Sequence, residues 1–108
     1  MNAIRLLVLL VLWPVPALAG TIFGNLREEA KSVGAGVTVQ ITCGGNPYQV
    51  ATDDYGAYSI NVPPGRCDLT VQYKGAWTAA YPVASSDDPA RYDFDLVYEN
   101  EKYVLRRR

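Results

Sequence analysis

The sequence predicts an all-β domain, a small β-sandwich, from three observations. Apolar and polar residues alternate along several short segments, which is the pattern of strands with one face in a core. Clusters of Gly, Pro, Asn and Asp separate these segments, with turn signals every ~8–12 residues. No part of the expected domain has a convincing helical pattern, and 108 residues allow at most one domain.

The N-terminal half is expected to form three strands. Its first connection is polar and punctuated by glycine, and its charged stretch is too short to nucleate a helix alone. Its second connection is a turn rich in Gly, Asn and Pro. The expected strands are residues 21–26, 37–43 and 48–52, the loop is 27–36, and the turn is 44–47.

The middle of the chain holds the best-patterned segment. Asp53, Asp54 and Gly56 predict a turn, since aspartate caps its own backbone and glycine adopts positive φ without steric cost. The strand at residues 57–62 follows, and prolines then end it. A second alternating strand, residues 67–73, pairs with the first as a hairpin or lies in a facing sheet.

The C-terminal part is expected to close the sandwich. A proline-interrupted segment reads as a weak edge, and a clear alternation follows the next loop. By this alternation Tyr58, Tyr73, Tyr92 and Tyr98 are core or edge residues. The expected elements are the edge segment 76–83, the loop 85–89, the closing strand 92–98, the turn 99–102 and a last short strand at 103–105.

The central segment also carries a family resemblance. Residues 52–65 read T-D-x-x-G-x-Y-x-I-x-V-P-P-G and lead into an alternating strand. This resembles the carboxypeptidase regulatory-like domain over residues 21–73, and more loosely to residue 98. The resemblance implies a small Greek-key β-sandwich, transthyretin-like (prealbumin-like), grouped by fold with carbohydrate-binding-like domains. It carries no catalytic residues.

The N-terminal segment has the features of a signal peptide. Arg5 precedes an apolar run at residues 6–13, and Ala17-Leu18-Ala19 matches an A-x-A cleavage site. The alternative is a membrane anchor, but a helix that spans a bilayer needs ~20 apolar residues. We therefore expect a signal peptide at residues 1–19, a β-sandwich domain at residues 20–108, and a secreted or periplasmic protein without a membrane anchor after cleavage.

The two cysteines are expected to form a disulfide. An exported chain enters an oxidising compartment, where disulfides persist. Cys43 lies on the apolar face of its strand, and Cys67 lies on the apolar face of another. Both thiols therefore point into the same core, at strand ends that the intervening turns can bring together. A catalytic or metal-binding thiol is the alternative, but the chain has no histidine to accompany it.

Composition excludes several functions. The formal net charge of −1 gives no general attraction to nucleic acid. Arg106, Arg107 and Arg108 form a local basic run, which we interpret as a solvated tail. Without histidine there is no Ser-His-Asp or Cys-His arrangement, and the chain also lacks the C-terminal Tyr-Arg-Gly-Ser motif of transthyretin-related hydrolases. We expect no enzyme activity and no cofactor.

Paired acidic residues are the remaining candidates for chemistry. They could ligate calcium or act as a glycosidase acid and base. Simpler interpretations are turn capping for the first two pairs and the solvent face of a strand for the third. We therefore expect no metal site at Asp53/Asp54, Asp87/Asp88 or Asp93/Asp95.

Aromatic residues suggest a binding surface. Trp77 and Tyr81 could form a platform on which a sugar ring stacks, although packing within the sandwich is the favoured interpretation. Tyr55, at a turn tip, is the better candidate for an exposed ring. The leading hypothesis is an accessory or protein-interaction module that binds through its loops or an edge strand, with a protein or polysaccharide partner. The alternative is a carbohydrate-binding module.

Overall fold

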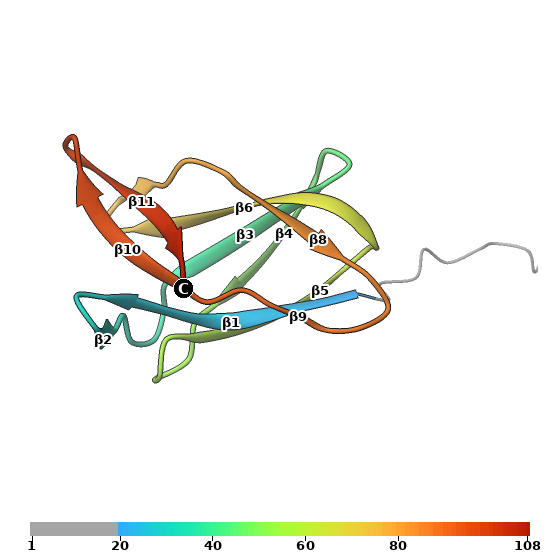
Figure 1. The fold of residues 1–108 in the computed structure, drawn as a ribbon, viewed down its shortest axis with the longest axis horizontal. Coiled ribbons are helices and arrows are strands. Elements are labelled where there is room, and N and C mark those ends of the chain that lie inside the picture. Colours follow the sequence, from blue (N-terminus) through green and yellow to red (C-terminus); the bar gives the residue numbers. More distant parts are fainter. Residues whose placement is uncertain (1–19) are drawn as a thin grey trace, which may run out of the picture.

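The structure is a computed structural model that describes residues 20–108, so the predicted signal peptide lies outside the described residues. Two β-sheets pack face to face in this part of the chain (Figure 1), and the predicted all-β sandwich is confirmed. Residues 20–108 contain no helix that is long and apolar enough to cross a membrane.

The first sheet is built around β1 (Gly20–Glu28). One side of β1 pairs antiparallel with β5, while the other side pairs in parallel with β9 and then β10. β11 continues the sheet beyond β10 as a hairpin. The strands around β1 are β2 (Lys31–Ser32), β5 (Ala57–Val62), β9 (Ala90–Arg91), β10 (Phe94–Glu99) and β11 (Lys102–Arg107).

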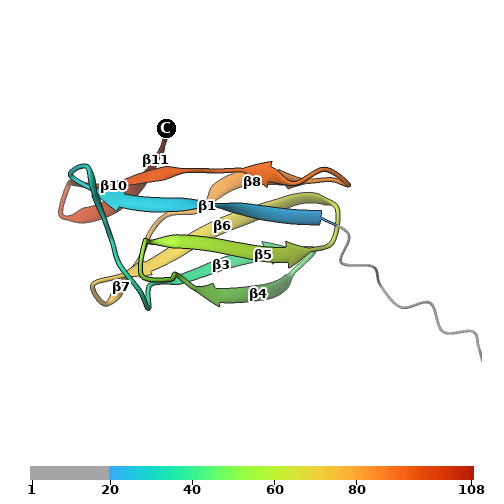
Figure 2. The ribbon, with the colours of Figure 1, turned by 90° about the horizontal axis from the view of Figure 1, so that it is seen from below.

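The second sheet has the order β4-β3-β6, with β7 and β8 both paired to the far side of β6. β5 and β6, which flank the Pro63-Pro64 turn, belong to different sheets (Figure 2). Of the two predicted alternatives, the pair of strands in facing sheets is therefore correct, and the hairpin is not. The bounds are β3 (Thr38–Cys43), β4 (Asn46–Ala51), β6 (Gly65–Tyr73), β7 (Ala76–Trp77) and β8 (Tyr81–Ser85).

The loop expected at residues 27–36 is wrong in part. β1 continues to Glu28 and turns back into β2, so that Glu28 pairs with Lys31. The turn residues Glu29 and Ala30 have φ of 53° and 66°, the backbone of a two-residue hairpin that usually carries Gly or Asn. Because neither residue is typical of that turn, the local pattern does not predict it.

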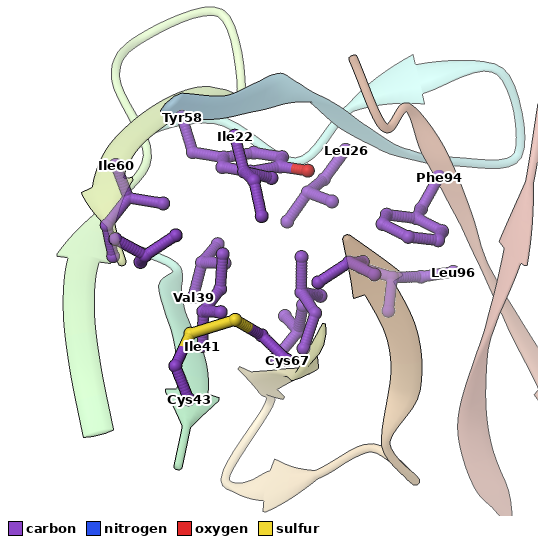
Figure 3. Packing of buried hydrophobic residues seen from close by; sticks show 14 residues of the cluster. Ile22, Leu26, Val39, Ile41, Cys43, Tyr58, Ile60, Cys67, Phe94 and Leu96 are labelled. Carbon is purple, nitrogen blue, oxygen red and sulfur yellow. A yellow bond between two sulfur atoms is a disulfide. The ribbon is translucent and has the colours of Figure 1, made fainter. Parts of the chain in front are cut away.

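The core lies between the two sheets and follows the predicted alternation. Apolar residues at every second position of β1, β3, β5, β6 and β10 point inward and interdigitate (Figure 3). Phe94 and Ile22 are among the largest side chains that are fully buried. Each contributes roughly 2–3 kcal/mol through burial of its apolar surface, so this layer is the main source of stability.

Gly24 makes room for the link between β9 and β10, which runs beside β1. It faces inward between Ile22 and Leu26, and a Cβ at this position would lie 1.9 Å from the carbonyl oxygen of Tyr92. The same carbonyl accepts a hydrogen bond from the Tyr58 hydroxyl at 2.6 Å. A side chain at residue 24 would therefore push the link between β9 and β10 away from the sheet.

The predicted disulfide is present between Cys43 and Cys67. The two residues lie directly opposite each other on β3 and β6, with Cα atoms 4.4 Å apart. Both side chains are buried in the core, as their positions on the apolar faces predicted. The bond therefore fixes the two central strands of the second sheet to each other at one end.

Candidate functional site

Trp77 and Tyr81 do not form a common platform. Tyr81 points into the sandwich, where its ring packs edge-on against Phe94 with centroids 4.9 Å apart. Trp77 lies opposite the exposed Gln72 on the outer face of the sheet, and 46% of its surface is exposed. The favoured interpretation, packing within the sandwich, is therefore correct for Tyr81. The ring of Trp77 is exposed to solvent without Tyr81 beside it.

Tyr55 is exposed at the tip of the turn between β4 and β5, as predicted, with 79% of its surface accessible. The turn is held by Asp53, whose Oδ1 accepts hydrogen bonds from the backbone N–H groups of Tyr55 and Ala57 at 2.8 and 3.0 Å. Gly56 has φ of 74°. The turn is therefore rigid at its base and presents one aromatic ring to solvent.

The pair Asp93/Asp95 is not a bare solvent face, which corrects that expectation. Asp93 accepts a hydrogen bond from the backbone N–H of Asn25 at 2.9 Å and pairs with Arg91 at 2.8 Å. Burial raises the pKa of Asp93, but these two partners outweigh it and hold the pKa below its usual value. Asp95 contacts Arg27 and Arg108. Within residues 20–108, no group of three or more His, Cys, Asp and Glu residues could hold a metal ion.

The C-terminal arginines are not a solvated tail, so that interpretation is wrong. The first two belong to β11, which extends the predicted strand at 103–105. Arg107 stacks on the ring of Tyr92 at 4.2 Å and donates to the carbonyl of Arg91. Arg108 donates to Asn25 and pairs with Asp95 at 3.2 Å. These contacts attach the end of the chain to β1.

Residues far apart in sequence form a cluster at one end of the sandwich. The carboxylate of Glu28 accepts hydrogen bonds from the hydroxyls of Tyr73 and Tyr103 at 2.6 and 2.8 Å. Lys74 lies 3.5 Å from the same carboxylate. Tyr98, expected as a core or edge residue, packs against Tyr103 and is 62% exposed. We call Glu28, Tyr73, Lys74, Tyr98 and Tyr103 the tyrosine cluster.

Hydrogen bonding in the tyrosine cluster shifts two pKa values in opposite directions. The Tyr73 and Tyr103 hydroxyls donate to the Glu28 carboxylate, and these bonds lower its pKa. Burial and the bond to Glu28 raise the pKa of Tyr73 to about 12. Every polar group named here has a partner, so the cluster joins β1, β6 and β11 and is interpreted as a structural contact.

The free edge of β5 differs from the tyrosine cluster because some of its backbone polar groups point into solvent. The Leu26 N–H donates to the Gly56 carbonyl at 2.9 Å, in the register that continues along β1 and β5. Hydrogen-bonded pairs alternate in an antiparallel ladder, so Tyr58, Ile60 and Val62 direct their backbone groups toward β1. The backbone N–H and C=O groups of Ser59 and Asn61 therefore point away from the sheet, and both residues are exposed.

Two longer edge strands in the described part of the chain are blocked. On β4 the hydrogen bond from Thr52 N–H to the Val37 carbonyl sets the alternation, so Pro47 faces the free edge without an N–H. On β8, Pro82 likewise lacks an N–H, and the hydroxyl of Tyr92 accepts the Ala84 N–H at 3.0 Å. Prolines at edges prevent further strand pairing.

The remaining edges are short or charged. β2 and β7 have two residues each. β11 carries Lys102, Arg106 and Arg107, and charges of this kind discourage pairing with another strand. β5 has six residues, none of them charged and none proline. It is therefore the one long edge, within residues 20–108, that lacks the usual protection.

A groove of about 550 Å³ lies on the outer face of the sheet beside this edge. Phe23 forms part of its lining and faces away from the core, with the guanidinium of Arg91 5.7 Å from the centroid of its ring. Asp53, Ala51 and Ser59 line it near β5. The sequence alone does not indicate this groove, because it does not show which strands lie beside β1 and Phe23.

Comparison with protein families supports the same reading of the fold. The family model of the carboxypeptidase regulatory-like domain matches residues 21–97, which is most of the chain. A search of curated proteins for relatives finds no match. The family is a regulatory, non-catalytic type of domain, which supports an accessory or interaction role in general terms. The chain belongs to the carboxypeptidase regulatory-like domain family.

Proposed function

We propose that this protein is an exported, non-enzymatic module that binds another protein by adding one of its extended segments to the free edge of β5. The observation that carries the proposal is the outward direction of the backbone groups of Ser59 and Asn61. In strand addition, main-chain hydrogen bonds supply affinity and neighbouring grooves supply specificity. β5 offers both, because the edge is open and the groove adjoins it.

Two features support export. The N-terminal sequence has the charged, apolar and A-x-A regions of a signal peptide. The disulfide between Cys43 and Cys67 fits an oxidising compartment such as the periplasm or the extracellular space. N-terminal sequencing of exported protein is expected to begin at Gly20, and a retained Met1 in a membrane fraction would contradict this part of the proposal.

The absence of enzyme activity rests on the described side chains. The carboxylates of Asp93 and Asp95 are engaged by arginines, and Asp53 holds a turn. Within residues 20–108, the hydrogen bonds of these three carboxylates come from backbone N–H groups and arginines and not from a serine, threonine or cysteine side chain that they could activate as a general base. Hydrolase screens are expected to stay blank, and a reproducible turnover lost in Asp93→Asn would overturn the proposal.

Carbohydrate binding is a second candidate, supported by one surface. The exposed ring of Trp77 lies beside Gln72 on the outer face of the second sheet. The neighbouring outward positions, Thr38, Gln40 and Thr70, are uncharged and polar. A sugar can stack on an indole and form hydrogen bonds with such side chains. Retention on a polysaccharide column that is lost in Trp77→Ala, and kept in Tyr55→Ala, would favour this candidate.

A peptide library tests strand addition directly. Random twelve-residue peptides are selected on the disulfide-bonded domain, and enriched peptides are added to isotope-labelled protein. The amides of Ser59 and Asn61 are expected to exchange slowly only when peptide is bound. Enrichment no greater than on the Ser59→Pro variant, or protection of other amides instead, would contradict the proposal.

Gln49→Pro is the matched control for Ser59→Pro. Gln49 lies on β4 at an outward-facing backbone position, so its proline also removes an edge N–H without breaking the ladder. Peptide binding is expected to persist in Gln49→Pro. Loss of binding in both variants would contradict assignment of the site to β5.

A further inference from the structure

We propose that the groove beside β5 selects an extended partner segment with a large apolar side chain followed, two residues later, by lysine or arginine. This inference rests on the proposed strand addition and specifies the chemistry of the partner. It comes from the apolar surface of Phe23, the charge of Asp53, and the hydrogen-bonding alternation of β5.

The position of the apolar side chain follows from the face of the sheet. Ser59 lies opposite Phe23 in the register between β5 and β1, and both side chains are on the outer face. A residue added opposite Ser59 would direct its side chain to that face as well, since directly opposed residues share a face. Phe23 is next to it across one strand, so a large apolar side chain can fold over Ser59 onto the ring.

The basic residue follows from the charges of the groove. Arg91 is already paired with Asp93 at 2.8 Å. Asp53 uses its Oδ1 to hold the turn, and within residues 20–108 no hydrogen bond or ion pair reaches its Oδ2. The exposed Asp54 adjoins it. The uncompensated charge of this end of the groove is therefore negative.

The spacing and order follow from the turn. The Asp53 N–H donates to the Ala57 carbonyl, and the Ala57 N–H donates to Asp53 Oδ1, so an added strand can pair with Ser59 but not with Ala57. In an antiparallel strand, the residue two positions after the one opposite Ser59 approaches Ala57 and thus Asp53. The order is therefore apolar-x-basic. A second copy of β5 does not fit this requirement, because β5 has no basic residue.

Three eight-residue probes test the order of side chains. Each peptide has an acetylated N-terminus and an amidated C-terminus. Its residues alternate between Thr and Val, except at two positions separated by one residue, which differ between the probes. The first carries Phe-x-Arg, the second Arg-x-Phe, and the third Ser-x-Glu. We expect the first to bind about tenfold more tightly than the second, because aromatic contact and charge pairing act together only in that order.

Two pairs of variants locate the contacts. Asp53→Asn keeps the oxygen that holds the turn. This variant is expected to weaken binding of the Phe-x-Arg probe about two- to fivefold, while Asp54→Asn is expected to change the affinity less. Phe23→Thr is expected to weaken it about tenfold, while Trp77→Thr, which removes an aromatic ring from the other sheet, has no effect. Melting temperatures establish that each variant is folded.

The results separate the two levels of the proposal. If all three probes protect the amides of Ser59 and Asn61 with equal affinity, strand addition stands and the selectivity proposed here is wrong. If Arg-x-Phe binds more tightly than Phe-x-Arg, the antiparallel order is wrong. If no probe protects those amides, while library-selected peptides also fail to do so, the proposed function itself is wrong. Self-association that protects the same amides without any probe would identify a second copy as the occupant.

Discussion

β5 and β8 are edge strands of different sheets, yet only one of these two edges is closed. β8 has Pro82 at an outward-facing position, and the Ala84 N–H is accepted by the hydroxyl of Tyr92. β5 leaves the backbone groups of Ser59 and Asn61 in solvent. An open edge invites aggregation, so proteins generally block it. The protection of one edge and not the other is therefore what supports the proposed strand addition at β5.

The largest expected effect is a loss of stability on reduction of the disulfide, which lies in the other sheet from the open edge of β5. Reduction of the bond between Cys43 and Cys67, whose loop spans 24 residues, should cost roughly 3 kcal/mol in the chain-entropy model. For a domain of this size each kcal/mol shifts the melting temperature by about 4–8 °C, so calorimetry should show a loss of more than ~10 °C. Free thiols titrating in the native exported protein would contradict this expectation.

Matched cysteine variants sharpen that result. Cys43→Ala and Cys67→Ala should each cost about as much as the double variant, because either change removes the same link. The bond lies in the sheet that carries the closed edge, so peptide protection of Ser59 should survive below the new melting temperature. Loss of protection in folded Cys43→Ala protein would show that the two sheets do not behave separately.

Opening the closed edge is the next largest effect. Tyr92→Phe removes the acceptor of the Ala84 N–H at 3.0 Å but keeps the ring under Arg107. The loss of this hydrogen bond should destabilise the fold by about 1 kcal/mol. Hydrogen exchange should quicken at Ala84 and not at Ser59, and unchanged exchange at Ala84 would mean that the β8 edge is closed in another way.

A loss of stability of similar size is expected at the tyrosine cluster. Its carboxylate and hydroxyl groups are hydrogen-bonded to each other, in contrast to the unpaired backbone groups of the β5 edge. Tyr73→Phe removes one donor to Glu28 and should cost about 1 kcal/mol at neutral pH. The folded pKa of Glu28 is lowered from 4.5, so its contribution is present above the unfolded value and is lost as pH falls through the folded value. Between pH 5 and pH 2, the free energy of unfolding measured by denaturant titration should therefore fall less steeply in Glu28→Gln than in the unsubstituted protein. Parallel curves for the two proteins would contradict the role of this carboxylate.

Closing the open edge should have the smallest effect on stability. Ser59→Lys places a charge at the edge in the way that other proteins protect edges, and an exposed substitution of this kind changes stability by about 0.5 kcal/mol or less. Binding of library-selected peptides should nevertheless be lost. Gln49→Lys on the blocked β4 edge is the control, and equal loss in both variants would remove the distinction between the edges.

Alternation and turn residues predicted most of the strands, because these signals are local. The inward faces of residues 37–43 and 57–62 were correct, and the shared inward direction of Cys43 and Cys67 led to the disulfide. The turn at Glu29 and Ala30 was missed because its residues are not the usual ones for positive φ.

The contacts between distant segments could not be predicted in the same way. Glu28 and Tyr103 are 75 residues apart, and nothing in either neighbourhood indicates the other. Arg108 likewise contacts Asn25 on β1, which lies 83 residues away in the sequence, so its local sequence does not indicate that contact. The sequence suggests an edge strand as one possible binding surface, but identifying β5 requires the hydrogen-bond alternation of the edge strands and the positions of Pro47 and Pro82 within it.

Amide hydrogen exchange of Ser59 and Asn61 is the most direct measurement of the central claim. In the free protein both amides should exchange at nearly unprotected rates, while Ile60 between them, which is bonded to β1, and Ala84 on the closed edge should exchange slowly. Addition of the Phe-x-Arg probe should slow Ser59 and Asn61 and leave Gln49 unchanged. Slow exchange of Ser59 and Asn61 without any peptide, in monomeric protein, would mean that the edge is already occupied and would contradict the account.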